Sequence, residues 1–276
     1  MSRKILLNSY KSSAALRLCS TLSHISTNID STGCAVISMN KAPVNSLNLE
    51  MLLDLKKNLN AALENKCKGV ILTSDLKSVF SGGLDILEMY KPQEERLKEF
   101  WSSLQDIGLL LYGFKIPVIA AINGHSPAGG CYLSLTTDYR IMVQKYSIGL
   151  NETKLGIVAP FWFREPMINT IGYRQAELAL ELGTLFTTED ALKIGLVDEM
   201  VPDKATAIDN AKKKILEFSV IPKQAFQMTK LEMRRPVIEK LLNNREADLN
   251  QFVSFCTSPE VQKSLEFYLE TLKKKK

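Results

Sequence analysis

Glu152 is the residue whose type and surroundings first indicate chemistry in this sequence. In the stretch SIGLNETKLGIVAPFWF, residues 147–163, it stands before a long apolar run in which Lys154 is the only other charge. A carboxylate in a loop is usually solvated and inert. Against an apolar wall it loses hydration, and this loss raises the pKa of a carboxyl group toward the range of a proton shuttle.

Two glycine-rich loops offer a second kind of chemistry. FSGGLD (residues 80–85) and NGHSPAGG (residues 123–130) each contain a Gly-Gly pair beside an apolar segment. Glycine lets the backbone approach a ligand and present its N–H groups, and a helix beginning at the second pair would add its positive end. Tight turns explain most such pairs, so either pair alone is a weak signal. The motifs GxxxxGK[ST] and GxGxxG are absent, which argues against phosphate loops.

Cysteine and histidine usage argues against a metal site. The five cysteines are scattered without a CxxC pair, which makes structural zinc improbable and favours a reducing compartment. Only two histidines occur, His24 and His125, too few for a His-rich site. We therefore predict no metal. The cysteines are Cys19, Cys34, Cys67, Cys131 and Cys256.

The N-terminal segment differs in composition from the rest of the chain. Residues 1–29 hold four of the 35 basic residues and no Asp or Glu, and they are rich in Ser, Leu and Ala. The 31 basic residues that remain face 30 acidic ones, so the body is nearly neutral. This composition predicts a mitochondrial transit peptide over residues 1–29. A disordered start is the alternative. The neutral body gives no electrostatic argument for nucleic-acid binding.

The elements that must position these residues follow from hydrophobic periodicity. Short apolar runs predict strands over residues 33–39, 68–74, 117–122 and 138–143, while residues 49–64 and 92–113 have helical character. A short helix is expected from residue 131. After residue 160 helical patterns dominate, and the one further strand signal is at 197–201. The alternation predicts an α/β core with parallel strands, followed by a helical C-terminal region.

Several ordered motifs resemble one known family. VFSGGLDILEM, AAINGHSPAGGCYLSLTTDYRI and GLNETKLGIVAP are similar to the crotonase (enoyl-CoA hydratase/isomerase) superfamily. The likeness runs from about residue 30 to the end. It is strongest to the mitochondrial isomerases of the family, through NKAPVNSL, GVILTSD, SPAGGC, IGLNET and APFW. The resemblance implies a spiral of ββα units, usually trimeric, with C-terminal helices at the trimer interface.

The resemblance also implies roles for individual residues. The backbone N–H groups of Leu84 and Gly129 would hold the thioester oxygen as an oxyanion hole, and Glu152 would be the catalytic base. Asn151 matches a substrate-contacting position, with orientation of the carboxylate or a plain turn as alternatives. Asp85 shapes the CoA channel or caps the following helix. The implied substrate-binding residues are Gly82, Gly83, Leu84, Asp85, Ile86, Gly129 and Asn151.

The reaction depends on how many carboxylates the site holds. Hydratases of the family activate a water between two glutamates, and Tyr132 stands here at the position of the first. One base suffices to move a proton from C2 to C4, so the resemblance implies an isomerase that converts 3-cis- or 3-trans-enoyl-CoA to 2-trans-enoyl-CoA in β-oxidation of unsaturated fatty acids. The alternatives are an enoyl-CoA hydratase, or a non-catalytic acyl-CoA- or RNA-binding protein.

The remaining expectations concern organisation and partners. Residues 30–200 are expected to form the α/β spiral core and residues 201–276 a helical trimerisation region. We expect an acyl-CoA thioester substrate, a homotrimer, no cofactor besides the CoA of the substrate, and no nucleic acid. Apolar runs shorter than the ~18 residues of a membrane span predict no such span. The mitochondrial matrix is the expected location.

Overall fold

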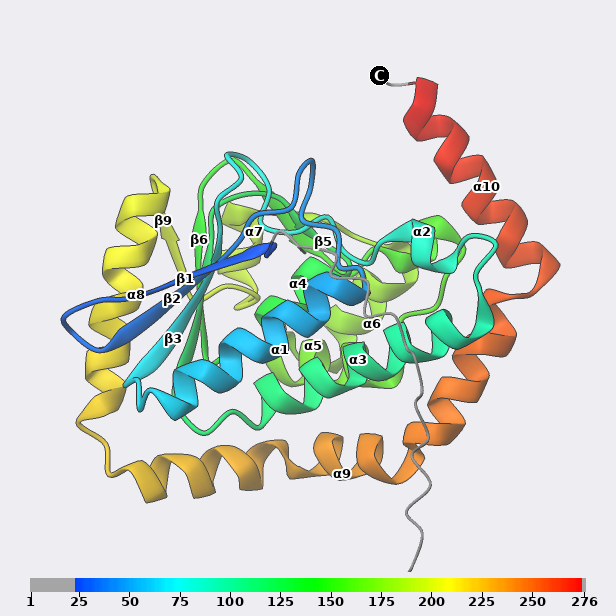
Figure 1. Cartoon of the computed structure of the whole chain (residues 1–276). Coiled ribbons are helices and arrows are strands. Elements are labelled where there is room, and N and C mark those ends of the chain that lie inside the picture. The colour runs from blue at the N-terminus through cyan, green and yellow to red at the C-terminus, as the bar shows by residue number, and fades with distance from the viewer. Residues whose placement is uncertain (1–22, 275–276) are drawn as a thin grey trace, which may run out of the picture.

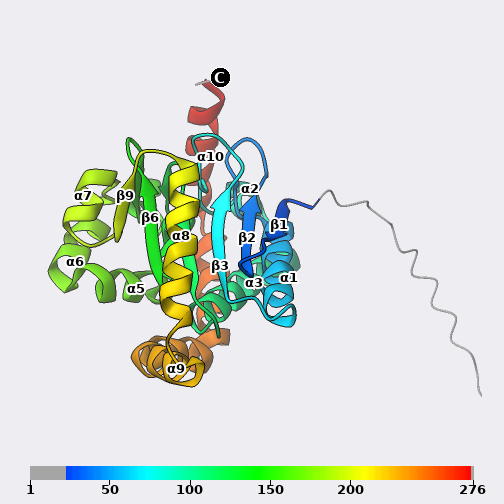
Figure 2. The same cartoon turned by 90° about the vertical axis from the view of Figure 1, so that its left-hand side faces the viewer.

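A six-stranded sheet forms the centre of the protein, whose computed structural model describes residues 23–274 (Figures 1 and 2). The strand order is β1-β2-β3-β4-β6-β9. All neighbouring strands are parallel except β1, which pairs with β2 in antiparallel fashion. The strands are β1 (Ile25–Ile29), β2 (Cys34–Met39), β3 (Gly69–Ser74), β4 (Val118–Ile122), β6 (Tyr139–Val143) and β9 (Glu199–Val201).

Helices cover both faces of this sheet. On one face α8 packs its small buried residues Ala207 and Ala211 against the strands, and Figure 2 shows it crossing the sheet. The contact is close, since a Cβ at Gly69 would lie 2.7 Å from Ile215 Cγ2. The larger core lies on the other face. The helices are α1 (Leu49–Glu64), α2 (Ile86–Met89), α3 (Glu94–Tyr112), α4 (Gly129–Leu135), α5 (Phe161–Ile171), α6 (Tyr173–Leu182), α7 (Thr188–Lys193), α8 (Lys204–Ser219), α9 (Lys223–Cys256) and α10 (Pro259–Lys274).

A small second sheet brings two loops together. It consists of β5 (Ser126–Pro127), β7 (Ser147–Gly149) and β8 (Phe186–Thr187). Strands β5 and β7 are parallel, with Pro127 opposite Gly149. Because β5 leads into the PAGG loop and β7 into the NET loop, their pairing places these loops side by side.

The two C-terminal helices wrap the core. In Figure 1, α9 runs beneath the molecule and α10 rises beside α2. A buried ionic cluster fastens α9, in which Asp138 accepts a hydrogen bond from Lys230 Nζ (2.8 Å) and forms an ion pair with Arg234 Nη2 (3.1 Å). Helix α10 is fastened by Gln262 Nε2, which donates to the carbonyl of Met89 (2.8 Å).

The structure confirms the expected fold class, a parallel α/β core followed by a helical C-terminal region. Helix α1 occupies the predicted residues, capped by the side chain of Asn48, which accepts from the N–H of Met51. Helix α4 begins at Gly129, two residues before the predicted start. Among residues 23–274, no helix is long and apolar enough to cross a membrane.

Strand β1 lies within the predicted targeting segment, residues 1–29. Residues 1–22 of that segment lie outside the described residues, whereas Ile25–Ile29 form β1 and pair with β2 from Ile25 opposite Met39 onward. A transit peptide ending at residue 29 would therefore include an ordered strand of the sheet. The domain boundaries themselves stay predictions.

Candidate active site

The base predicted from sequence, Glu152, begins a short 3-10 helix, η1 (Glu152–Leu155), just after β7. Gly156 ends η1 in the left-handed conformation (φ 69°), and the N–H of Ile157 donates to the Glu152 carbonyl (3.1 Å). This tight turn fixes the backbone of Glu152 beside β5.

The Glu152 carboxylate is buried and unpartnered. The residue is 8% exposed, and neither carboxylate oxygen has a hydrogen-bond partner in the described part of the chain. Burial raises its pKa from 4.5 to about 7, and the proximity of its own backbone N–H lowers the pKa by less. Leaving a buried carboxylate unpaired is costly. Its raised pKa near neutrality suits a group that takes up and returns a proton.

The two glycine-rich loops meet beside each other. A Cβ at Gly83 would lie 3.2 Å from the backbone nitrogen of Gly129, and one at Gly129 would lie 3.3 Å from the nitrogen of Leu84. Within residues 23–274, neither the Leu84 nor the Gly129 N–H donates a hydrogen bond. The reason for Leu84 is its bridge to Leu47, which uses the Gly83 carbonyl and the Asp85 N–H instead.

Backbone geometry at Ala128 orients the second donor. Ala128 has φ 50° and ψ −123°, an unusual conformation for a residue with a side chain. Its N–H donates to the Gly149 carbonyl (2.8 Å), which anchors the turn to β7. The next glycines are packed closely, since a Cβ at Gly130 would lie 2.5 Å from the Ser81 carbonyl oxygen. The strained turn thus starts α4 with the Gly129 N–H free.

One cavity joins the carboxylate and the first glycine loop. Glu152 lines it together with Gly82, Leu84 and Ala128, and Glu152 is the one Asp or Glu among its lining residues in the described chain. The remaining walls are almost wholly apolar. They are Ile86, Met89, Trp101, Leu155, Ile157, Val158, Pro160, Phe163, Phe252, Phe255 and Tyr268.

Gly82, Leu84 and Ile86 line this cavity, whereas the other predicted substrate-binding residues stand outside its lining: Gly83, Asp85, Gly129 and Asn151. The Asp85 side chain caps α2 by accepting from the N–H of Leu87 (3.1 Å) and pairs with Lys41 (2.9 Å). Burial favours a raised pKa for Asp85, but hydrogen bonds from Lys41 and Ser46 outweigh it and lower the pKa. Of the two roles expected for Asp85, its contacts match the one in which it caps the following helix. Asn151 precedes Glu152, and its amide oxygen is buried without a partner.

Tyr132, at the position of the missing carboxylate, faces another part of the core. Its ring stacks on Phe163 (3.8 Å between centroids), and a Cβ at Gly108 would lie 2.1 Å from its hydroxyl oxygen. It does not line the cavity of Glu152. The sequence placed Tyr132 at the site by motif position alone, and the helical direction of α4 explains the difference.

Other polar candidates are structural. His125 Nδ1 accepts from the N–H of Ser147 (3.2 Å), and its ring packs edge-on against Tyr146. Cys131 is buried, and burial raises the pKa of its thiol. Among residues 23–274, no group of three His, Cys, Asp or Glu could hold a metal ion.

Sequence reasoning missed the contribution of the C-terminal helices. Phe252 and Phe255 from α9, and Tyr268 from α10, line the cavity of Glu152. Their positions lie more than 90 residues along the chain from Glu152. No local motif marks them, because only tertiary packing brings α9 and α10 over the cavity.

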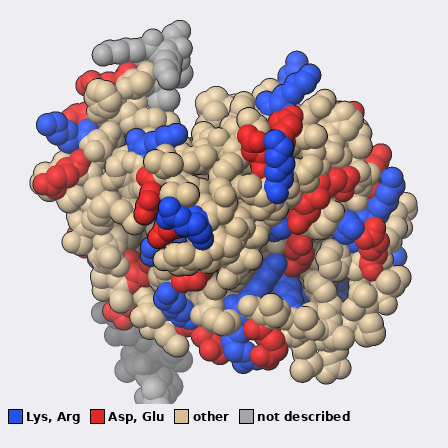
Figure 3. All heavy atoms as spheres, turned by 180° about the vertical axis from the view of Figure 1, so that it is seen from behind, with Lys and Arg blue, Asp and Glu red and all other residues tan. Residues whose placement is uncertain are grey.

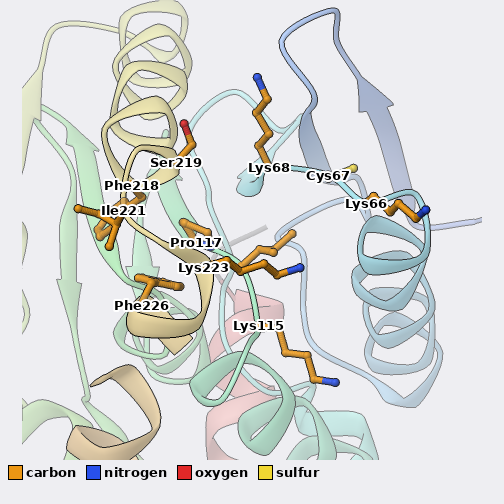
Figure 4. Close-up of a pocket in the computed structure, with 11 residues that line it drawn as sticks. Lys66, Cys67, Lys68, Lys115, Pro117, Phe218, Ser219, Ile221, Lys223 and Phe226 are labelled. Carbon is orange, nitrogen blue, oxygen red and sulfur yellow. The ribbon is translucent and has the colours of Figure 1, made fainter. Parts of the chain in front are cut away.

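A separate pocket lies at the opposite ends of the strands from the glycine loops (Figure 4). It borders Cys67 and Pro117, which precede β3 and β4, whereas the glycine loops follow the other ends of these strands. In Figure 4, Lys68 and Lys115 point to opposite sides. In the described chain its lining contains no Asp, Glu or His, and its ionisable residues are Lys66, Cys67, Lys68, Lys115 and Lys223.

The parallel sheet, and the two glycine loops beside an isolated carboxylate, are consistent with one protein family. Residues 30–275 match the enoyl-CoA hydratase/isomerase family, and the chain belongs to it. The chain is 47% identical over 247 residues to mitochondrial enoyl-CoA delta isomerase 1 of Mus musculus, covering 88% of this chain and 85% of the mouse protein. The Homo sapiens counterpart is 45% identical, with coverage of 88% and 82%.

Solved structures agree with this assignment. The crystal structure of human mitochondrial delta3-delta2-enoyl-CoA isomerase superimposes with a TM-score of 0.89 at 44% identity, covering 92% of this chain and 99% of that one. A probable enoyl-CoA hydratase of Mycobacterium tuberculosis gives a TM-score of 0.76 at 24% identity, covering 84% and 95%. The second likeness extends to the fold alone.

Proposed function

We propose that this protein is an isomerase that converts 3-cis- and 3-trans-enoyl-CoA to 2-trans-enoyl-CoA in the β-oxidation of unsaturated fatty acids. One observation carries the proposal: Glu152, the one buried carboxylate without a partner among residues 23–274, shares an apolar cavity with the loop that presents the Leu84 N–H. The relatives named enoyl-CoA delta isomerase support the same reaction.

The proposed mechanism uses one base and two donors. The thioester oxygen accepts hydrogen bonds from the N–H groups of Leu84 and Gly129. Glu152 removes a proton from C2, the electrons form an enolate, and the double bond moves from C3–C4 to C2–C3 as the same carboxyl returns the proton to C4. Preorganised donors stabilise the enolate oxygen, each typically by about 3 to 4 kcal/mol. The apolar walls keep water from the enolate.

Hydration is the alternative reaction, and the lining argues against it. Water addition needs a base for the water and an acid for the carbon, whereas Glu152 is the one carboxylate lining the described cavity. RNA binding is also disfavoured. Residues 212–214 are three consecutive lysines, of which Lys212 pairs with Asp30 and Lys214 with Glu217. Figure 3 shows charges of both signs interspersed on one face of the molecule.

Further parts of the proposal concern assembly and location. We place the protein in the mitochondrial matrix as a homotrimer, with residues 1–29 as the targeting segment. The mouse and human relatives are named mitochondrial, which supports the organelle. The proton transfer needs no cofactor beyond the substrate's CoA. An N-terminal fusion of residues 1–35 to a fluorescent reporter tests import, and a cytosolic reporter would contradict it.

The decisive experiment compares two substrates. Purified protein is incubated with 3-hexenoyl-CoA, and the absorbance of the conjugated thioester is followed. A parallel reaction with 2-hexenoyl-CoA is analysed by chromatography for 3-hydroxyacyl-CoA. We expect rapid conjugation and little hydrated product. Hydration as fast as isomerisation would overturn the one-base mechanism.

A further inference from the structure

A second cavity lies directly behind one wall of the catalytic cavity. It has a volume of about 240 Å³, against about 80 Å³ for the cavity of Glu152. The second cavity therefore has room for part of an acyl tail, and its lining is apolar except for Arg164, Asp248 and Gln251. The residues that line both cavities are Trp101, Val158, Pro160, Phe252 and Phe255.

One half of this shared wall is rigid. The rings of Trp101 and Phe252 stack with centroids 3.5 Å apart and planes 6° from parallel. Trp101 Nε1 donates to the Asp248 carboxylate (2.7 Å), which also accepts from Trp162 Nε1 (3.1 Å) and Gln105 Nε2 (2.8 Å). Hydrogen bonds to a carboxylate are strong, so they hold the indole of Trp101 in one orientation.

The other half of the wall is less constrained. Val158 is 65% exposed, and Phe255 is only partly buried at the end of α9. Asp248, Phe252 and Phe255 are four and three residues apart, so they share one face of α9. The fixed stack and the exposed edge therefore belong to the same seam between α3, α9 and the segment before α5.

We propose that the Trp101–Phe252 stack limits how well this protein accepts long acyl tails relative to short ones. Short tails end against the stack inside the cavity of Glu152. Longer tails pass between Val158 and Phe255 into the second cavity, where apolar side chains contact the rest of the acyl tail. Trp101 and Phe252 are specificity-determining residues in this scheme. The inference rests on the proposed isomerase function, because it needs an acyl thioester in the first cavity.

The test compares chain lengths in variants of the wall. Phe252→Ala joins the two cavities, and we expect kcat/KM for 3-dodecenoyl-CoA relative to 3-hexenoyl-CoA to rise about tenfold, the effect of one or two methylenes gaining a pocket. Phe252→Leu is a milder variant that keeps the core filled and should shift the ratio in the same direction. Gln251→Trp fills the second cavity from an exposed position of α9 and should lower the ratio.

The matched control is Phe226→Ala, which removes a phenyl ring from the pocket at the opposite ends of the strands from the glycine loops. It should leave the ratio unchanged. Calorimetric binding of hexanoyl-CoA and dodecanoyl-CoA gives a readout independent of turnover. If the binding ratio shifts while no variant or wild type isomerises, the chain-length inference stands and the proposed reaction fails.

Two results would overturn the inference. Unchanged ratios in both Phe252 variants, with folded protein, would show that the stack does not limit the chain. Equal losses for short and long chains in Gln251→Trp would show that the second cavity admits the CoA end and not the acyl tail.

Discussion

Two buried carboxylates of this protein have opposite surroundings. Asp138, just before β6, accepts from the N–H of Val118 (2.9 Å) and from Lys230 Nζ (2.8 Å), and it forms an ion pair with Arg234. The side chain of Asp138 is 7% exposed and Glu152 is 8% exposed, yet neither oxygen of Glu152 has a partner in the described chain. The first carboxylate fastens α9 to the sheet. The oxygens of the second carboxylate remain available to accept a proton from a bound molecule.

The contrast distinguishes a carboxylate that stabilises the fold, Asp138, from one that does not, Glu152. Breaking a buried ion pair by removing one partner is strongly destabilising, because the other charge is left uncompensated. An unpartnered carboxylate already carries such a cost, and its raised pKa of about 7 expresses it. We therefore expect changes at Asp138 to affect stability, and changes at Glu152 to affect turnover.

The largest expected effect is that of Glu152→Gln on turnover. The amide is nearly isosteric but cannot accept the C2 proton, so kcat for 3-hexenoyl-CoA should fall by about 10³-fold or more. Calorimetry should show little change in acyl-CoA affinity, because the pocket keeps its shape. Turnover near that of the wild type would remove Glu152 from the mechanism.

Asp138→Asn should produce the complementary result. It leaves Lys230 buried without its counter-charge, and we expect the free energy of unfolding to drop by about 3 kcal/mol in urea titrations. Folded protein should keep its kcat. The control is Asp190→Asn, which breaks an exposed pair with Lys193 and should cost less than about 1 kcal/mol. Equal losses in the two variants would contradict the distinction.

Gly129→Ala tests the second N–H donor of the proposed oxyanion hole. The new Cβ would lie 3.3 Å from the Leu84 nitrogen and would crowd the thioester oxygen, so we expect kcat to fall by about 10²-fold. Gly113→Ala is the matched control, because Gly113 has a negative φ and its Cβ would approach only a carbonyl and two side chains. Activity unchanged in Gly129→Ala would argue against this oxyanion hole.

The smallest expected effect is the pH dependence set by Glu152. The base must be deprotonated, and its pKa is about 7 in the folded protein. Thus kcat/KM should rise about tenfold per pH unit below pH 7 and level off above it. An unperturbed carboxyl would instead place this rise near pH 4.5. A profile flat from pH 5 to 8 would show that burial does not control the active proton.

Local motifs predicted helix α1 and pointed to three site candidates that the structure brings close together. Helix α1 was predictable because Asn48 caps it and its apolar residues repeat at helical spacing. Glu152 and the two glycine loops were identified as site candidates because each loop directly follows or borders a strand of a parallel sheet. The ends of such strands meet at one edge, so residues distant in sequence come together there.

Other parts of the structure had no local signal. Strand β1 reads ISTNI, and only its first residue is buried, so it shows no alternation that would mark a strand. The direction of Tyr132 depends on where α4 begins, and that start is set by the strained turn at Ala128. The stacking of Phe252 on Trp101 joins residues about 150 positions apart, which periodicity within either helix does not reveal.

Helix α10 has a consequence for the order in which the protein is made. Its Tyr268 closes one wall of the cavity, and Tyr90 Oη donates to Glu266 (2.7 Å) to hold the helix against α2. Every strand of the main sheet is synthesised before α10 leaves the ribosome. A chain that stops before residue 259 would therefore contain Glu152 and both glycine loops, while the cavity of Glu152 would lack the wall that Tyr268 forms.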